Sequence, residues 1–150
     1  MRVLVQRVSE ASVAIEKEIR SKIGSGVLIL LGIENEDNQE DVDWLCAKIA
    51  KLRIFADGEG IMNLSLMDTK GEALVVSQFT LHASTKKGNR PSYINAARPE
   101  VAIPLYEEFI SRLTQVLGKE IETGEFGADM KISLINDGPV SIWIDSKSKE

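Results

Sequence analysis

The chain has 150 residues, a formal net charge of -5 and 43% hydrophobic residues. This length suits a single domain with a sizeable core. The acidic balance argues against a protein that coats nucleic acid along its length, because such a protein needs a broad basic surface, but it allows one that grips a single RNA end.

Cysteine content and apolar runs exclude further classes. Cys46 is the only cysteine, so no internal disulfide can form, and its place among helical apolar residues predicts a buried structural thiol. The longest apolar run, residues 27–31, is too short to span a bilayer, and the sequence after Met1 lacks a signal-peptide pattern. We therefore expect a soluble cytoplasmic protein without a membrane partner.

The first third of the chain predicts strands. Residues 1–9 and 11–15 alternate apolar and polar side chains around a short turn, and residues 19–23 continue this pattern. Residues 27–31 (VLILL) are apolar throughout, which is typical of a strand buried on both faces. The four segments together predict an antiparallel meander.

Helical spacing follows twice in the remaining sequence. Apolar residues from Val42 to Leu52 recur at helical intervals, and a second helix is expected between Pro99 and Gly118. Residues 121–130, which include an exposed-looking Phe126, predict a loop with at most a short strand. Further short strands are expected at residues 53–55, 61–66, 131–135 and 140–144.

The most informative stretch is residues 73–81, ALVVSQFTL. An apolar strand runs directly into Ser77, Gln78 and Thr80, where a core strand would normally carry Val or Ile. Each unpaired buried amide or hydroxyl costs about 1–3 kcal/mol, so these groups indicate a hydrogen-bonded network or the floor of a ligand site. The polar, basic segment 82–92 that follows favours the ligand site.

Several common catalytic arrangements are missing. The sequence has no P-loop or GxGxxG glycine pattern, no CxxC, and only one histidine, His82, so we expect no metal ion and no cofactor. If the strand continued, His82 would share a face with Thr80, which leaves a Thr-His pair open as an alternative to simple packing.

A second unusual stretch is residues 136–141, NDGPVS. Gly138 and Pro139 between two strands can form a simple reversal. A bond between Gly and Pro can also be cis, which would aim main-chain carbonyl groups in a direction that a trans bond cannot.

These two stretches make the sequence resemble the D-aminoacyl-tRNA deacylases, whose signature motifs are SQFTL and NxGPxT. The resemblance extends over the whole chain, through QRV and ASV near the start, then LGIE, RIF, MNLS, RPS and FGADM in the family's order. One departure is Ser141, which stands where the family has Thr; the hydroxyl is kept and a methyl group is lost.

The resemblance implies a single α+β domain over residues 1–150, with an antiparallel barrel-like sheet and two main helices. It implies hydrolysis of the ester of D-aminoacyl-tRNA, and of glycyl-tRNA mischarged on tRNA(Ala), by a homodimer. Gly138 and Pro139 of one subunit would enter the partner's pocket as a cis pair and exclude an L side chain, with Arg7 steadying that motif and Asn136 belonging to it.

The resemblance also implies roles for individual residues. Phe79 and Thr80 would offer N–H groups near the scissile carbonyl, and Ser77 and Gln78 would organise the pocket, while the substrate's ribose 2′-hydroxyl assists. The remaining expected contacts are with tRNA. They are Lys86, Lys87 and Arg90 for phosphates, and Phe126, Ala128 and Met130 around the terminal adenine.

Two other functions stay open. A hydrolase of small esters or amides could use Thr80 as a covalent nucleophile, although the sequence supplies no evident general base. A non-catalytic module that binds an RNA end or a protein could use the same polar groove.

Overall fold

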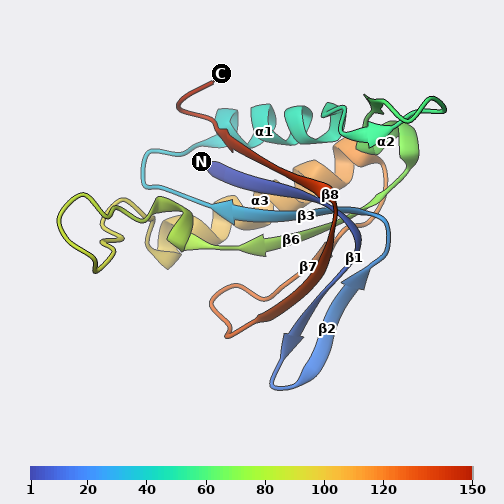
Figure 1. The fold of residues 1–150 in the computed structure, drawn as a ribbon. Coiled ribbons are helices and arrows are strands. Elements are labelled where there is room, and N and C mark those ends of the chain that lie inside the picture. The colour runs from blue at the N-terminus through green and yellow to red at the C-terminus, as the bar shows by residue number, and fades with distance from the viewer. Residues whose placement is uncertain (150) are drawn as a thin grey trace.

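The computed structural model describes residues 1–149, and Figure 1 shows their arrangement. The elements are β1 (Arg2–Ile15), β2 (Glu18–Ile23), β3 (Gly26–Gly32), α1 (Gln39–Lys51), β4 (Phe55–Ala56), β5 (Met62–Leu64), α2 (Leu66–Thr69), β6 (Glu72–Ser77), the 3-10 helix η1 (Phe79–His82), α3 (Pro99–Leu117), β7 (Glu122–Thr123) and β8 (Lys131–Asp145).

The main sheet is curved into a nearly closed barrel. Its strand order is β2-β1-β3-β6-β7, and β8 pairs with β1. The two end strands approach each other, since the Ser21 hydroxyl on β2 donates to the Thr123 carbonyl on β7 at 2.8 Å. The predicted α+β class with a barrel-like sheet and two main helices is confirmed.

Strand β1 differs from its prediction because it serves two parts of the sheet. Its first half pairs with β3, its second half pairs with β2, and β8 follows it along both halves. The expected turn between residues 9 and 11 is therefore wrong, and β1 runs on through two register shifts between Gln6 and Glu10. The predicted meander is also wrong, because β1 lies between β2 and β3.

Other differences arise where a long-range partner decides the local structure. Strand β6 lies parallel to β3, which requires a crossover, and the segment containing α1 provides it. Residues 66–69, expected within or after a strand, form α2 with Ser65 as its N-cap. Residues 131–145 form one strand, β8, because β1 pairs with it on both sides of residues 137–139.

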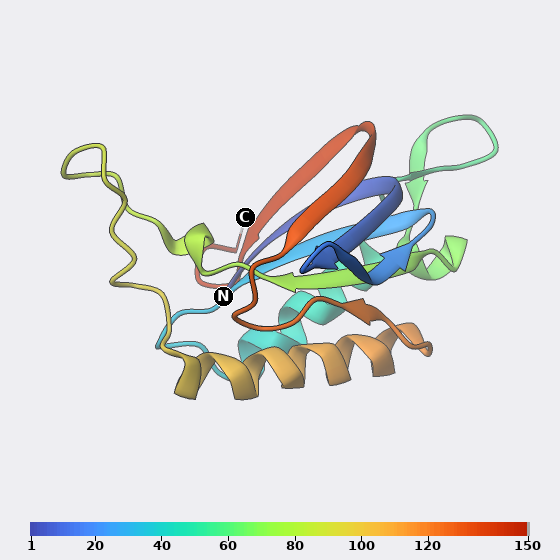
Figure 2. The same cartoon turned by 90° about the horizontal axis from the view of Figure 1, so that it is seen from below.

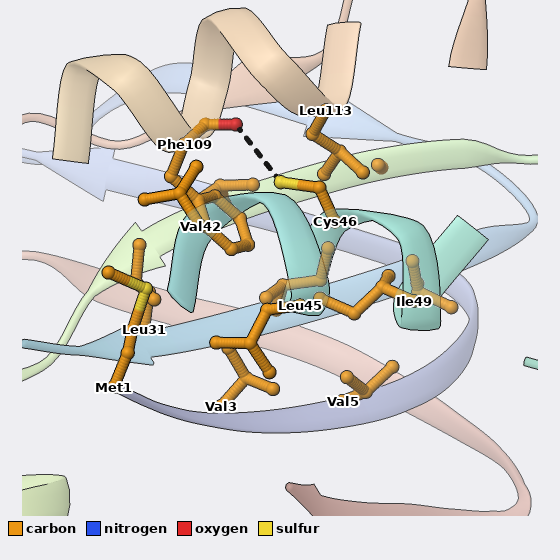
Figure 3. Close-up of a cluster of buried hydrophobic side chains, with 14 of the residues drawn as sticks. Met1, Val3, Val5, Leu31, Val42, Leu45, Cys46, Ile49, Phe109 and Leu113 are labelled. Atoms are coloured by element: carbon orange, nitrogen blue, oxygen red, sulfur yellow. Dashed lines mark hydrogen bonds between the residues drawn. The ribbon is translucent and has the colours of Figure 1, made fainter. Parts of the chain in front are cut away.

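Helices α1 and α3 cover one face of the sheet, as Figure 2 shows from below. The core between the helices and the sheet combines Val3, Val5 and Leu31 from the sheet with Leu45 from α1 and Phe109 from α3 (Figure 3). A second buried cluster lies inside the curve of the sheet and consists of Val8, Ala11, Val13, Ile23, Leu28, Leu74 and Val76.

Cys46 lies in the first of these clusters. It is fully buried, and its thiol contacts the carbonyl of Phe109 at 3.6 Å. Burial raises the pKa of the Cys46 thiol to about 12. The predicted buried, structural thiol is confirmed.

Across residues 1–149, no helix has both the length and the apolar character needed to cross a bilayer.

Candidate active site

The SQFTL segment lies where β6 ends beside β3. Ser77 is the last residue of β6 and pairs with Leu31, and the N–H of Gln78 then donates to the Leu31 carbonyl at 2.7 Å. The chain turns at this point into η1. The expectation that Thr80 and His82 share one face of a strand is therefore wrong, because residues 79–82 form a 3-10 helix.

Gly32 allows η1 to lie directly against β3. A Cβ atom at residue 32 would lie 2.9 Å from the Cβ of Leu81 and 3.1 Å from the carbonyl oxygen of Gln78. Real Cβ atoms essentially never come this close to a neighbouring carbon. The position of η1 therefore depends on residue 32 being glycine, which has no Cβ.

Polar groups of this segment converge at the start of η1. The Gln78 side-chain amide donates to the Thr80 hydroxyl oxygen at 3.0 Å, so the hydroxyl proton stays free to donate elsewhere. Within residues 1–149, the backbone N–H groups of Phe79 and Thr80 have no hydrogen-bond acceptor. Two free N–H groups at the start of a helical turn can bind a carbonyl oxygen that becomes negatively charged.

A cavity of about 220 Å³ opens beside these groups. The residues that line it are Leu31, Ile33, Ser77, Gln78, Phe79, Thr80, Ala97, Ala102, Phe126, Gly127, Ala128 and Met130. The structure thus brings the SQFTL segment together with the three residues expected around the terminal adenine. Leu31, Ile33, Ala97, Ala102 and Gly127 were not predicted, because small and apolar residues carry no signal of a site until the fold places them.

Phe126 is less exposed than its sequence context indicates. It is half-buried, and its ring packs against Tyr106 of α3 with centroids 5.6 Å apart. The expectation of an exposed Phe126 is wrong, because Tyr106 of α3 covers one side of its ring.

His82 lies in η1 but points into the interior. Its side chain is 1% exposed, and neither ring nitrogen makes a hydrogen bond with Thr80. Burial lowers the pKa of His82, so the imidazole is neutral near pH 7. Because it makes no hydrogen bond with Thr80, His82 does not form a nucleophile and base pair with that hydroxyl.

The Asn136–Pro139 segment lies elsewhere, as a projection of β8 beside β1. The Asn136 side chain closes it, accepting from the Val140 N–H at 2.8 Å and donating to the Ser141 hydroxyl at 3.0 Å. The serine that replaces the family threonine therefore keeps a hydrogen bond. The peptide bond between Gly138 and Pro139 is cis, and both residues are exposed.

Arg7 on β1 holds this projection in place through hydrogen bonds of its guanidinium group. Its Nε donates to the Asp137 carbonyl at 2.7 Å and its Nη1 to the Ile54 carbonyl at 2.5 Å. Gly138 has φ of 145°, a backbone conformation that residues with a side chain rarely adopt, so this position favours glycine. Neither Gly138 nor Pro139 lines the cavity of its own chain.

Lys86, Lys87 and Arg90 lie on a loop that extends away from the sheet (Figures 1 and 2). All three are exposed, and none lines the cavity. The loop returns towards the site at Tyr93, whose ring contacts Phe79 edge-on with centroids 5.0 Å apart. Across residues 1–149, no group of three His, Cys, Asp or Glu side chains is placed to hold a metal ion.

The chain is also similar to known proteins in sequence. The family model for D-Tyr-tRNA(Tyr) deacylase matches residues 4–145. D-aminoacyl-tRNA deacylases from Bacteroides thetaiotaomicron and Flavobacterium psychrophilum are 65% and 64% identical over 150 residues, which is all of each chain.

Two solved structures are similar in fold. One, named c-Myc DNA Unwinding Element Binding Protein, has a TM-score of 0.93 and 41% identity, and the match covers 97% of this chain and 98% of the other. A probable eukaryotic D-amino acid tRNA deacylase has a TM-score of 0.82 over 95% of this chain and 97% of its own, and its 16% identity supports the fold alone. The family-model match and the curated relatives show that the chain belongs to the D-Tyr-tRNA(Tyr) deacylase family, hydrolases that act on the ester bond of aminoacyl-tRNA.

Proposed function

We propose that this protein hydrolyses the ester bond of D-aminoacyl-tRNA and releases the free D-amino acid and tRNA. The observation that carries the proposal is the cavity beside η1, into which the Ser77–Thr80 segment brings hydroxyl, amide and free N–H groups. A volume of about 220 Å³ is sufficient for a small group such as an aminoacyl moiety.

Hydrolysis of this ester does not require a strongly nucleophilic side chain. An ester of a ribose hydroxyl is already activated, so positioning and stabilisation of the oxyanion can carry most of the reduction in barrier. In our proposal the scissile carbonyl oxygen accepts from the N–H groups of Phe79 and Thr80, and the neighbouring 2′-hydroxyl of the substrate assists. Thr80 then acts as a hydrogen-bond donor, since His82 does not reach it.

We propose that chiral selection requires a second copy of the chain. Gly138 and Pro139 are exposed and do not line the cavity of their own chain, so they could reach a bound substrate only in another subunit. Exposed Ile135 on the same strand and the exposed Phe79–Tyr93 pair beside the cavity favour a contact between copies. Main-chain groups in that position would exclude an L side chain by clash, and glycine would pass.

The remaining contacts follow from the nature of the substrate. Phe126, Ala128 and Met130 would frame the terminal adenine, and Lys86, Lys87 and Arg90 would meet phosphates of the acceptor end. Glycyl-tRNA mischarged on tRNA(Ala) would be a second substrate. We expect the enzyme to act in the cytoplasm, where aminoacyl-tRNA is used, and to need no cofactor.

The test measures hydrolysis of D-tyrosyl-tRNA and L-tyrosyl-tRNA. We expect wild-type protein to cleave only the D form, and Thr80→Ala to keep measurable activity. The variant with Ala at both Gly138 and Pro139 should lose activity or chirality, and Pro139→Ala alone leaves the glycine backbone intact as a milder control. Sedimentation at working concentration should give a dimer; an active monomer would refute the role of the second copy.

Two outcomes would select another function. Complete loss of activity in Thr80→Ala, with an acyl-enzyme detected by mass spectrometry in the wild type, would make Thr80 a nucleophile. Binding of aminoacyl-tRNA without turnover would identify a module that binds nucleic acid, the candidate that the name of the 41% identical structure favours.

A further inference from the structure

A hollow of about 520 Å³ lies outside the candidate active site, between α1 and the end of β8. Trp44 and Lys48 of α1 line one side of it, and Arg2 and Trp143 line the other. A second hollow of about 390 Å³ continues along α1 and shares Trp44 and Lys48 with the first. We call the two together the tryptophan groove.

Cations lie over both indole rings of the groove. The ammonium groups of Lys48 and Lys149 lie 5.4 and 5.0 Å from the ring centroid of Trp44, and the Arg2 guanidinium lies 5.7 Å from that of Trp143. Trp143 is 51% exposed, so one aromatic surface in the groove remains open to solvent.

The charge of the groove opposes that of the whole chain. Lys51 and Arg53 extend the positive lining of the second hollow. Among residues 1–149, Asp145 is the only acidic residue that lines either hollow, and Arg2 already pairs with it at 2.8 Å. In residues 1–149, neither Lys48 nor Lys51 forms an ion pair. A protein of net charge -5 thus carries a local positive groove with one open aromatic ring.

This combination fits one class of ligand. Lysine and arginine side chains neutralise phosphates, and exposed indoles stack on bases, which together are how proteins hold a strand of nucleic acid. An acidic peptide would use the cations but not the open ring. We infer that the tryptophan groove binds a segment of the substrate tRNA beyond its terminal aminoacyl adenosine, an inference that rests on the proposed function.

Arg2 connects the groove to the candidate active site. While its Nε pairs with Asp145, its Nη1 donates to the Leu81 carbonyl of η1 at 3.1 Å. A strand of RNA in the groove would therefore lie one side chain away from the helix that presents Phe79 and Thr80. Binding energy from this remote part of the substrate would help to hold the ester in place.

The first test is direct and independent of catalysis. Trp44 and Trp143 are the only tryptophans of the chain, so intrinsic fluorescence reports on the groove alone. Deacylated tRNA should quench this fluorescence, and Lys48→Glu should weaken binding about 10-fold, which corresponds to one lost phosphate contact and one repulsive charge. The control is Lys22→Glu on β2, which makes the same charge change at an exposed position away from the groove. Equal binding by wild type and Lys48→Glu would overturn the inference.

The second test separates the groove from the chemistry. Trp143→Ala should raise KM for full-length D-tyrosyl-tRNA roughly 5- to 10-fold, the range expected for the loss of one stacking contact on the exposed ring. Hydrolysis of D-tyrosyl-adenosine, which is too short to reach the groove, should not change. Equal effects on both substrates, or a changed oligomeric state, would overturn the inference in favour of a structural role or a contact between copies.

The two proposals fail separately. If wild-type protein hydrolyses neither substrate, the proposed function is wrong, while quenching by deacylated tRNA still decides whether the groove binds RNA.

Discussion

Substituting Gly32 by alanine should damage the candidate active site more than the fold. The new Cβ would lie 2.9 Å from Leu81 Cβ, 3.0 Å from His82 Cδ2 and 3.1 Å from the Gln78 carbonyl oxygen, so η1 must move outward by about half an ångström to reach ordinary contact. Overpacking of this size costs about 1–3 kcal/mol of unfolding free energy. Because misplacement by about 1 Å can cost about 100-fold in rate, we expect kcat/KM for D-tyrosyl-tRNA to fall about 10-fold.

Gly58→Ala is the matched control for this experiment. It makes the same chemical change at a glycine where a Cβ would meet no atom within 4 Å, so both stability and rate should stay close to wild type. Urea unfolding and single-turnover hydrolysis at saturating enzyme measure the two quantities. A Gly32→Ala protein with wild-type rate would show that the position of η1 against β3 does not matter for catalysis, and would refute the oxyanion role given to Phe79 and Thr80.

Three further predictions concern titratable groups. Burial raises the pKa of Cys46 to about 12, so iodoacetamide at pH 8 should modify the thiol only as fast as the protein unfolds, and rapid modification of the native protein would contradict its burial. Burial lowers the pKa of His82 in the folded protein. As pH falls below about 6.5, His82 therefore takes up a proton in the unfolded state before it does so in the folded state, and the free energy of unfolding should decline by up to about 1.4 kcal/mol per pH unit. His82→Leu should remove this part of the slope in chemical unfolding at pH 5 to 7, and an unchanged slope would refute it. Burial alone would raise the pKa of Asp41, but hydrogen bonds from Lys147 and Ser146 outweigh it and lower the pKa to about 2. The lowered pKa of Asp41 contributes about 2 kcal/mol to the free energy of unfolding above pH 4, and this contribution is lost as pH falls towards 2. Asp41→Asn should show no such loss of stability between pH 4 and pH 2.

The sequence by itself determined the elements whose signal is local. Helix α3 runs from Pro99 to Leu117 with Gly118 as its C-cap, as its proline, apolar spacing and glycine predict. The buried strands and the buried Cys46 follow from apolar patterns that need no knowledge of partners. The SQFTL motif also located the candidate site, since polar residues at the end of a buried strand are unusual whatever the fold.

Only the tertiary structure decided how these pieces meet. The order of strands depends on which edges pair, and alternation within β1 cannot reveal that one strand serves β2, β3 and β8. The 3-10 turn at Phe79 forms because Gly32 leaves room for it on a neighbouring strand, and no local pattern encodes that contact. The apolar wall of the cavity and the tryptophan groove likewise join residues distant in sequence. Each of their side chains looks ordinary until packing places it beside the others.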